Sequence, residues 1–176
     1  MAHRRTLIAL TAALLLLACR PAPPSAQKIP VPPPEKSPAP RTRTVTLFFL
    51  SVSSGELAPV LAEMEASEDP GSTARGVLEL LLAGPKDPAF APPLPAGTSI
   101  RGLYPIGEFL AADLALPPAA APFDGTRNEL DVAYAVANTV CLNVPEYKGV
   151  HLLINGTDRS PFFTHLDLSR PLRPKL

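Results

Sequence analysis

The sequence predicts an α+β fold, a two-layer sandwich in which two helices cover one face of a mixed β-sheet. Segments rich in β-branched and aromatic residues have the length and spacing of strands at 44–52, 56–64, 98–104, 109–115 and 150–155. Between them, apolar residues recur with a helical period from about residue 72 to 83 and again over 126–143. The expected order is therefore β-β-α-β-β-α-β, and this mixture of hairpins and helices is typical of a sandwich with one core.

The first two strands are expected to form a hairpin at the edge of the sheet. Residues 44–52 are apolar on both faces, as in a well-buried strand, and Ser53-Ser54-Gly55 is a turn signal. Residues 56–64 then return as the partner strand. Because Pro59 has no backbone N–H to donate to a ladder, this second strand belongs at an edge.

The first helix is predicted by an apolar stripe with helical spacing, made by Ala74, Val77, Leu78, Leu81 and Leu82. It ends at Gly84-Pro85, because glycine adopts the cap conformation and proline cannot continue a helix. Residues 98–104 and 109–115 follow as a second hairpin, joined by Pro105-Ile106-Gly107-Glu108.

The second helix is predicted to begin with a capping box, in which Glu129 reaches back towards Thr126 at the helix start. Asn138 and Thr139 interrupt its apolar pattern. Because a buried asparagine must be hydrogen-bonded, we interpret Asn138 as a bracket that holds a loop. The last strand ends at Asn155-Gly156, and a short extended piece is expected around 162–168.

The N-terminus has the features of an export signal. A basic start is followed by an uncharged run over 6–18, which is too short to span a bilayer. The run ends in Leu16-Leu17-Ala18-Cys19, which resembles the lipobox of bacterial lipoproteins. The resemblance implies cleavage before Cys19 and attachment of lipid to its side chain, with acyl groups such as palmitate. The alternative is an ordinary secretory signal with an incidental cysteine.

A proline-rich tether is expected between the lipid and the folded domain. Nine of the 21 residues from Pro21 to Arg41 are proline, a composition that favours polyproline II and a semi-rigid spacer. The chain therefore divides into a signal peptide at 1–18, the lipidated cysteine and tether at 19–43, and one domain at 44–176.

Charge is segregated along the chain, although the formal net charge is zero. Residues 44–172 hold seven Lys and Arg against fifteen Asp and Glu, a net charge of −8, whereas residues 20–43 hold five basic residues and one acid. An acidic domain argues against nucleic acid as a partner, because nucleic-acid binding needs a basic face.

The sequence contains few residues with catalytic potential. None of the common nucleophile, phosphate-binding or zinc-protease motifs is present. His165 and Asp167 form the best local pair for a metal, but structural roles are favoured because further ligands are missing. Cys141 lies in an apolar helical pattern and is interpreted as a small buried hydrophobe. Asp113 is expected to hydrogen-bond to backbone. No enzyme activity, cofactor or metal is predicted.

Several motifs, in order and spacing, resemble the GerM-type (GerMN) domain of sporulation and germination proteins. They run from Leu47-Phe48-Phe49-Leu50 through Asn138-Thr139 and Asn155-Gly156 to His165-Leu166-Asp167. The resemblance covers 44–172 and implies a non-enzymatic domain, with Asn138, Thr139, Asn155, Gly156, His165 and Asp167 as structural motif residues.

Together these features predict a lipid-anchored, non-catalytic module of the cell envelope that faces the periplasm or exterior. Its partners are expected to be the membrane, through the lipid, and an envelope protein or a second copy of the chain. The expected role lies in envelope assembly, sporulation or germination. The alternative is a ligand-binding lipoprotein or an accessory factor for cell-wall enzymes, which binding to purified wall material would favour.

Overall fold

The structure, a computed structural model, describes residues 41–120, 125–159 and 162–176. Its elements are β1 (Thr42–Ser51), β2 (Leu57–Glu65), α1 (Pro70–Ala83), β3 (Phe90–Ala91), β4 (Ser99–Ile106), β5 (Phe109–Ala115), α2 (Gly125–Asn143) and β6 (Gly149–Ile154). The expected signal peptide, Cys19 and most of the tether lie outside the described residues. The α+β class is confirmed, and so is every strand and helix predicted up to residue 155.

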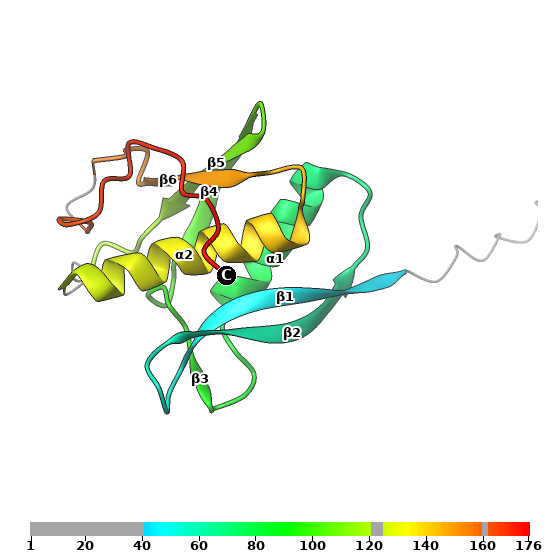
Figure 1. Ribbon diagram of the computed structural model, residues 1–176, viewed down its shortest axis with the longest axis horizontal. Coiled ribbons are helices and arrows are strands. Elements are labelled where there is room, and N and C mark those ends of the chain that lie inside the picture. Colours follow the sequence, from blue (N-terminus) through cyan, green and yellow to red (C-terminus); the bar gives the residue numbers. More distant parts are fainter. Residues whose placement is uncertain (1–40, 121–124, 160–161) are drawn as a thin grey trace, which may run out of the picture. The chain divides into compact units, whose positions relative to one another are not determined.

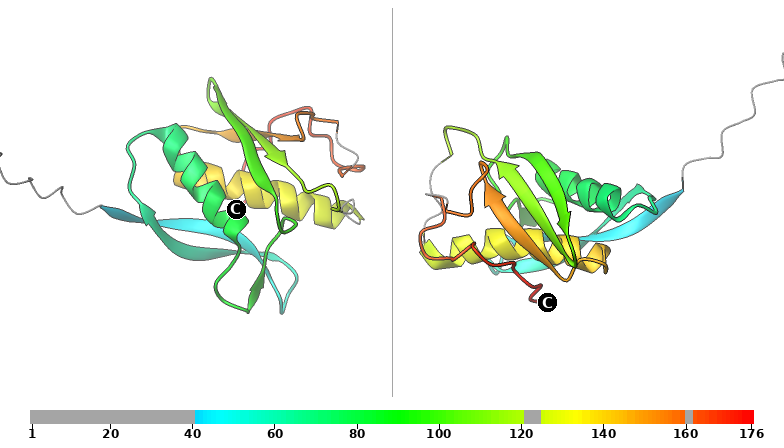
Figure 2. Two further views of the ribbon diagram at one scale, coloured as in Figure 1. Left: turned by 180° about the vertical axis from the view of Figure 1, so that it is seen from behind. Right: turned by 90° about the horizontal axis from the view of Figure 1, so that it is seen from above.

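The strands form two three-stranded sheets, where the sequence analysis expected one mixed sheet. The first sheet has the order β2-β1-β3 and is antiparallel throughout. The second has the order β4-β5-β6, with β4 antiparallel and β6 parallel to β5. Both helices lie between the sheets, so the domain has three layers (Figures 1 and 2). Both helices nevertheless pack on one face of each sheet, and packing of both helices on one face was predicted.

The β1–β2 hairpin follows the expected alternation and edge position. Val45, Leu47 and Phe49 point into the core, and β2 is the outer strand with Pro59 opposite Phe48. On its other side β1 pairs only briefly with β3, through Leu50 and Ser51. Two residues are too few for a periodic pattern, which is why β3 was not predicted.

Helix α1 is bounded by residues of the expected kinds, although it begins slightly earlier than predicted. Asp69 caps it by accepting a hydrogen bond from the Ser72 amide at 2.7 Å, and Pro70 occupies the first turn. Gly84 ends it with φ at 84°, a value that suits glycine. The inward side chains of α1 are almost completely buried.

The β5–α2–β6 unit joins the helical layer to the second sheet. Strands β5 and β6 are parallel, which requires a crossover, and α2 supplies it. Strand β4 continues to Ile106, so its hairpin turn is shorter than predicted. One continuous core holds side chains from both sheets and both helices.

The segment from Asn155 to Leu176 is irregular where it is described. The extended piece expected around 162–168 is therefore not a strand. Two isolated bridges connect this segment to β6 instead, at Ile154–Thr157 and Val150–Leu172. The segment is further attached by Phe163 and Leu168, which are buried in the core, and by polar side chains of the domain.

Candidate functional site

Glu129 is the most constrained polar side chain of the described domain. It is 0% exposed, and its two carboxylate oxygens accept bonds from the backbone amides of Thr164, His165 and Leu166 at 2.7–3.2 Å. The Thr164 hydroxyl and His165 Nδ1 lie 3.1 and 3.0 Å from Oε1. Burial alone would raise the pKa of Glu129, but these hydrogen bonds outweigh it and hold the pKa at about 2. Glu129 thus fastens the C-terminal segment to α2.

This role was not predicted, because Glu129 also fits a capping box. Its carboxylate is directed to residues 164–166, which lie 35–37 positions away in sequence. The side chain of Thr126, the other half of the expected box, lies outside what the structure describes. The sequence signal for the fastening role was an acidic residue four positions before Ala133, on the apolar face of the helix.

Three further polar residues of α2 bind distant backbone. Asn138 makes two 2.8 Å bonds with Lys175, one to its carbonyl and one from its amide, so the expected bracket holds the C-terminal residues. Thr139 accepts a bond from the Phe48 amide at 3.1 Å. Asn143, which the sequence analysis overlooked, accepts from the Thr46 amide and donates to the Thr46 carbonyl at 2.9 and 2.7 Å.

Residues Asn155 and Gly156 form a turn that is tied to the end of β5. Asn155 adopts φ of 55° and its side chain accepts a bond from the Leu116 amide at 3.2 Å. The Gly156 amide donates to Asp113 at 2.9 Å, and Arg101 lies 3.4 Å from the same carboxylate. Asp113 therefore bonds to backbone, as expected.

His165 and Asp167 are bonded to different neighbours. His165 contacts Glu129, whereas Asp167 accepts a bond from the Ser169 amide, and hydrogen bonds with Ser169 lower the pKa of Asp167. No group of three His, Cys, Asp or Glu that could hold a metal occurs within the described residues.

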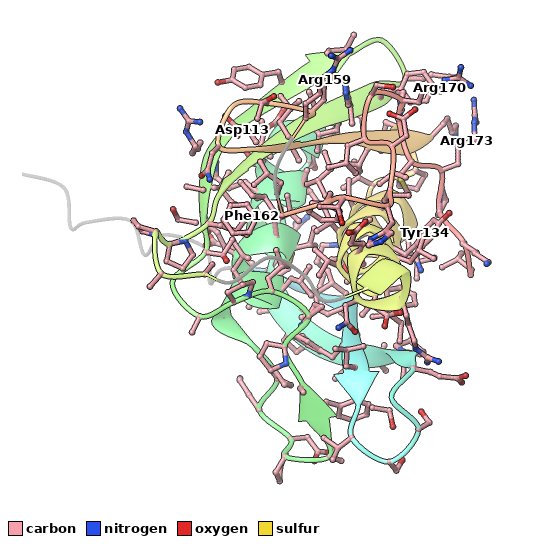
Figure 3. All side chains as sticks on the ribbon, turned by 90° about the vertical axis from the view of Figure 1, so that its left-hand side faces the viewer. Asp113, Tyr134, Arg159, Phe162, Arg170 and Arg173 are labelled. Atoms are coloured by element: carbon pink, nitrogen blue, oxygen red, sulfur yellow. The ribbon has the colours of Figure 1, made fainter. Side chains whose placement is uncertain are left out.

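The predicted motif residues therefore do not converge on one site. Figure 3 places Asp113 on the sheet of β4, β5 and β6, whereas Tyr134 lies lower in that view, on α2. Asn138 and His165 connect the irregular C-terminal segment to α2, whereas Thr139 bonds to β1 and Asp167 bonds within the C-terminal segment itself.

Cys141 has the character of an unreactive thiol. It is half-buried rather than fully buried, and burial raises its pKa to about 11 despite the opposing influence of Lys148. The Nε2 atom of His151 is buried and has no hydrogen-bond partner among the described atoms.

An apolar groove runs along the outer side of α2, with a volume of about 890 Å³. One wall is the flank of α2, and the other is the outward face of the β1–β2 hairpin. Lys175 and Leu176 close it from the C-terminal side. The apolar lining is provided by Phe48, Leu57, Pro59, Leu130, Tyr134, Leu142 and Leu176.

Charged residues mark the two ends of this groove. At the hairpin end, Arg127 donates to the Gly55 carbonyl at 2.9 Å and lies 3.7 and 4.0 Å from Asp131 and Glu56. Burial raises the pKa of Asp131, while Arg127 opposes the shift. At the other end, the Lys175 ammonium lies 5.9 Å from the centre of the Tyr134 ring, within cation–π range.

Within the described residues, no helix has both the length and the apolarity to cross a membrane.

Solved structures that resemble this chain come from two bacteria. A candidate lipoprotein from Clostridium perfringens is 17% identical, with a TM-score of 0.53 over 75% of this chain and 87% of that one. The first GerMN domain of the sporulation protein GerM from Bacillus subtilis is 20% identical, with a TM-score of 0.49 over 65% of this chain and 84% of that one. The tandem GerMN domains of GerM are 17% identical, with a TM-score of 0.48 over 66% of this chain and 40% of that one.

Among curated proteins, none matches this chain. Residues 46–160 match the family Germane, described as sporulation and spore germination, and this region runs from β1 through β6. The matched region is well over half of the 176 residues. The chain therefore belongs to the Germane family.

Proposed function

We propose that this protein is a lipid-anchored, non-catalytic module of the cell envelope that acts by binding another envelope protein, in the assembly processes of sporulation or germination. Family membership supports the connection with sporulation and germination. The Leu16–Cys19 sequence supports the anchor, and the proline-rich tether supports a domain held at some distance from the membrane.

One observation carries the proposal that the domain works by contact. The polar side chains that could have done chemistry, above all Glu129, Asn138 and Asn143, are used to bind backbone. A carboxylate with its oxygens filled by amides, and a pKa of about 2, is a poor general base at neutral pH. The groove along α2, by contrast, is open and apolar, as contact surfaces often are.

The anchor is tested by the Cys19→Ala variant, with Cys141→Ala as the matched control. Two or three acyl chains hold a protein on a membrane durably, because each buried CH₂ contributes about 0.8 kcal/mol. Cys19→Ala should therefore lose the acyl mass that intact-protein mass spectrometry detects on the wild type and on Cys141→Ala. An unmodified Cys19 in wild-type protein from the producing cells would refute the lipid anchor.

A further inference from the structure

The groove along α2 has two apolar walls, and the C-terminal residues Lys175 and Leu176 lie at one end of it, with Lys175 over the Tyr134 ring. On α2, Leu130, Tyr134 and Leu142 are spaced by four and eight residues and so lie on one side of the helix. Opposite them are Phe48, Leu57 and Pro59 on the outward face of the first sheet. Leu61, two residues beyond Pro59 on that face, is 71% exposed. Leu142 is 43% exposed.

The open edge of β1 decides which kind of segment can occupy this groove. An added strand would have to bond to the free N–H and C=O groups of that edge. The Thr46 amide and carbonyl are already bonded to Asn143, and the Phe48 amide is bonded to Thr139. A helix satisfies its own backbone and needs only side-chain contacts, so it can bind here where a strand cannot.

The spacing along α2 sets the length of such a helix. Leu130 and Leu142 are twelve residues apart, which corresponds to about 18 Å along the helix axis, or a little over three turns. Rows of side chains four residues apart are the ridges by which two helices interdigitate. A partner helix of about three to four turns with one apolar stripe would fill the groove.

The charges beside the groove favour a basic partner. Among the described residues, Arg127 is the basic group that lies beside both Glu56 and Asp131, at 4.0 and 3.7 Å, and both distances are long for an ion pair. Glu63 and Glu65 are exposed on β2 beyond Leu61 and share its outward face. At the groove itself Arg127 and Lys175 balance Glu56 and Asp131, so the acidic excess comes from Glu63 and Glu65 and from the domain as a whole, whose net charge is −8 over residues 44–172.

We propose that the groove binds an amphipathic helix of another protein, with an apolar stripe of about three turns flanked by lysine or arginine. This inference rests on the proposed function, because it identifies the surface and the partner chemistry of the contact. An added strand, a lipid surface and a second copy of this chain are the other possible occupants, and the crosslinking test distinguishes them from the helix.

The test is site-specific photo-crosslinking from the full chain in the cells that produce it. A photoreactive residue replaces Leu142 on one wall or Leu61 on the other, and Ile106, which is 57% exposed on the β4–β5 hairpin, is the control position. Mass spectrometry then identifies the crosslinked segment. We expect positions 142 and 61 to reach the same segment of one partner, at residues three or four apart and with basic neighbours, and position 106 not to reach it.

Charge reversal provides the second readout. Glu56→Lys should lower the crosslinking yield from position 142 at least about threefold, because it repels the basic flanks of the partner helix. Glu79→Lys on α1 changes the net charge equally, is also exposed, and should leave the yield unchanged. Equal yields in both variants would overturn the proposed partner chemistry.

Other crosslinking outcomes separate this inference from the proposed function. Adducts with lipid, with another copy of the chain, or with an extended segment would overturn the inference. An envelope protein captured at position 106 but not at 142 or 61 would also overturn it, while supporting the proposed function. Absence of adducts at all three positions would count against both.

Discussion

Glu129 shows how a single buried charge can fix an irregular segment. Its position inside a helix would be costly without partners, because a buried carboxylate must be hydrogen-bonded or neutralised. Amides of three successive residues, 164–166, supply those bonds. The segment carries no regular structure there, so its position depends on this one side chain more than on strand pairing.

We predict that Glu129 makes stability depend on pH in the acid range. Its pKa falls from the usual 4.5 to about 2 on folding, so its stabilising effect is fully present above about pH 4.5 and is lost as the pH falls towards 2. Glu129→Gln should lose about 2 kcal/mol or more in the free energy of unfolding at pH 7, and the deficit should shrink by pH 3. Urea unfolding at both pH values measures this.

Glu65→Gln is the control for that experiment, since Glu65 is exposed on β2. It should differ little from wild type at either pH. A Glu129→Gln deficit that is the same at pH 7 and pH 3 would show that lost packing, rather than charge, explains the effect.

Cys141 gives a second prediction at this scale. A thiol with a pKa near 11 has far less thiolate at neutral pH than one with the usual value of 9.0, by about a hundredfold. In the Cys19→Ala chain, where Cys141 is the remaining thiol, alkylation by iodoacetamide at pH 7.5 should be correspondingly slow and should accelerate up to about pH 11. Alkylation as fast as that of free cysteine would contradict the assignment of Cys141 as unreactive.

At the scale of elements, the contact between α2 and β1 replaces a strand pairing. Thr139 and Asn143 are four residues apart on α2 and bond to Phe48 and Thr46, two residues apart on β1. These side chains of α2 therefore form hydrogen bonds with the part of the β1 edge that does not pair with β3. This explains why the strands form two sheets with the helices between them.

We predict that Asn143→Ala is among the more destabilising polar substitutions in this domain. It leaves the amide and carbonyl of Thr46 without partners in a partly buried position, at a cost of about 2–4 kcal/mol in the free energy of unfolding. Arg75→Ala, which removes an exposed ion pair on α1, should change it by less than about 0.5 kcal/mol. Similar unfolding curves for both variants would show that the hydrogen bonds between Asn143 and Thr46 contribute little to the free energy of unfolding.

The elements with strong periodicity could be predicted from sequence, whereas their assembly into sheets could not. The alternation of Val45, Leu47 and Phe49 predicts a buried strand, and the apolar stripe of α1 predicts a helix, because each pattern depends only on local spacing. The separation into two sheets depends on side chains such as Asn143, which bonds to a strand 97 residues away. No local pattern contains that information.

The candidate site could likewise be predicted only where it depends on local sequence patterns, and not where it depends on contacts between distant residues. Asn138 could be assigned a bracketing role because a polar residue in an apolar stripe needs a partner, but its partner Lys175 could not be named. Glu129 was assigned to a capping box because its spacing from Thr126 fits one. The groove was not foreseen, since its walls come from β1, β2, α2 and the C-terminal residues, which only the fold brings together.

For the whole molecule, we propose that an anchored domain binds a partner at a reach set by its proline-rich tether. Extended polyproline rises about 3.1 Å per residue, so the nine prolines between Pro21 and Arg41 favour a spacer rather than a collapsed coil. Anchoring also concentrates the domain on a surface, where weak contacts suffice.

The most direct test is the yield of partner crosslinks from position 142 when residues 21–40 are deleted and Cys19 is kept. The deletion leaves β1 and all later elements intact, so thermal unfolding of the domain should be unchanged. We predict that the crosslink to the partner helix falls several-fold and returns when a Pro-rich segment of equal length is restored. An undiminished crosslink in the tether-deleted chain would contradict the account.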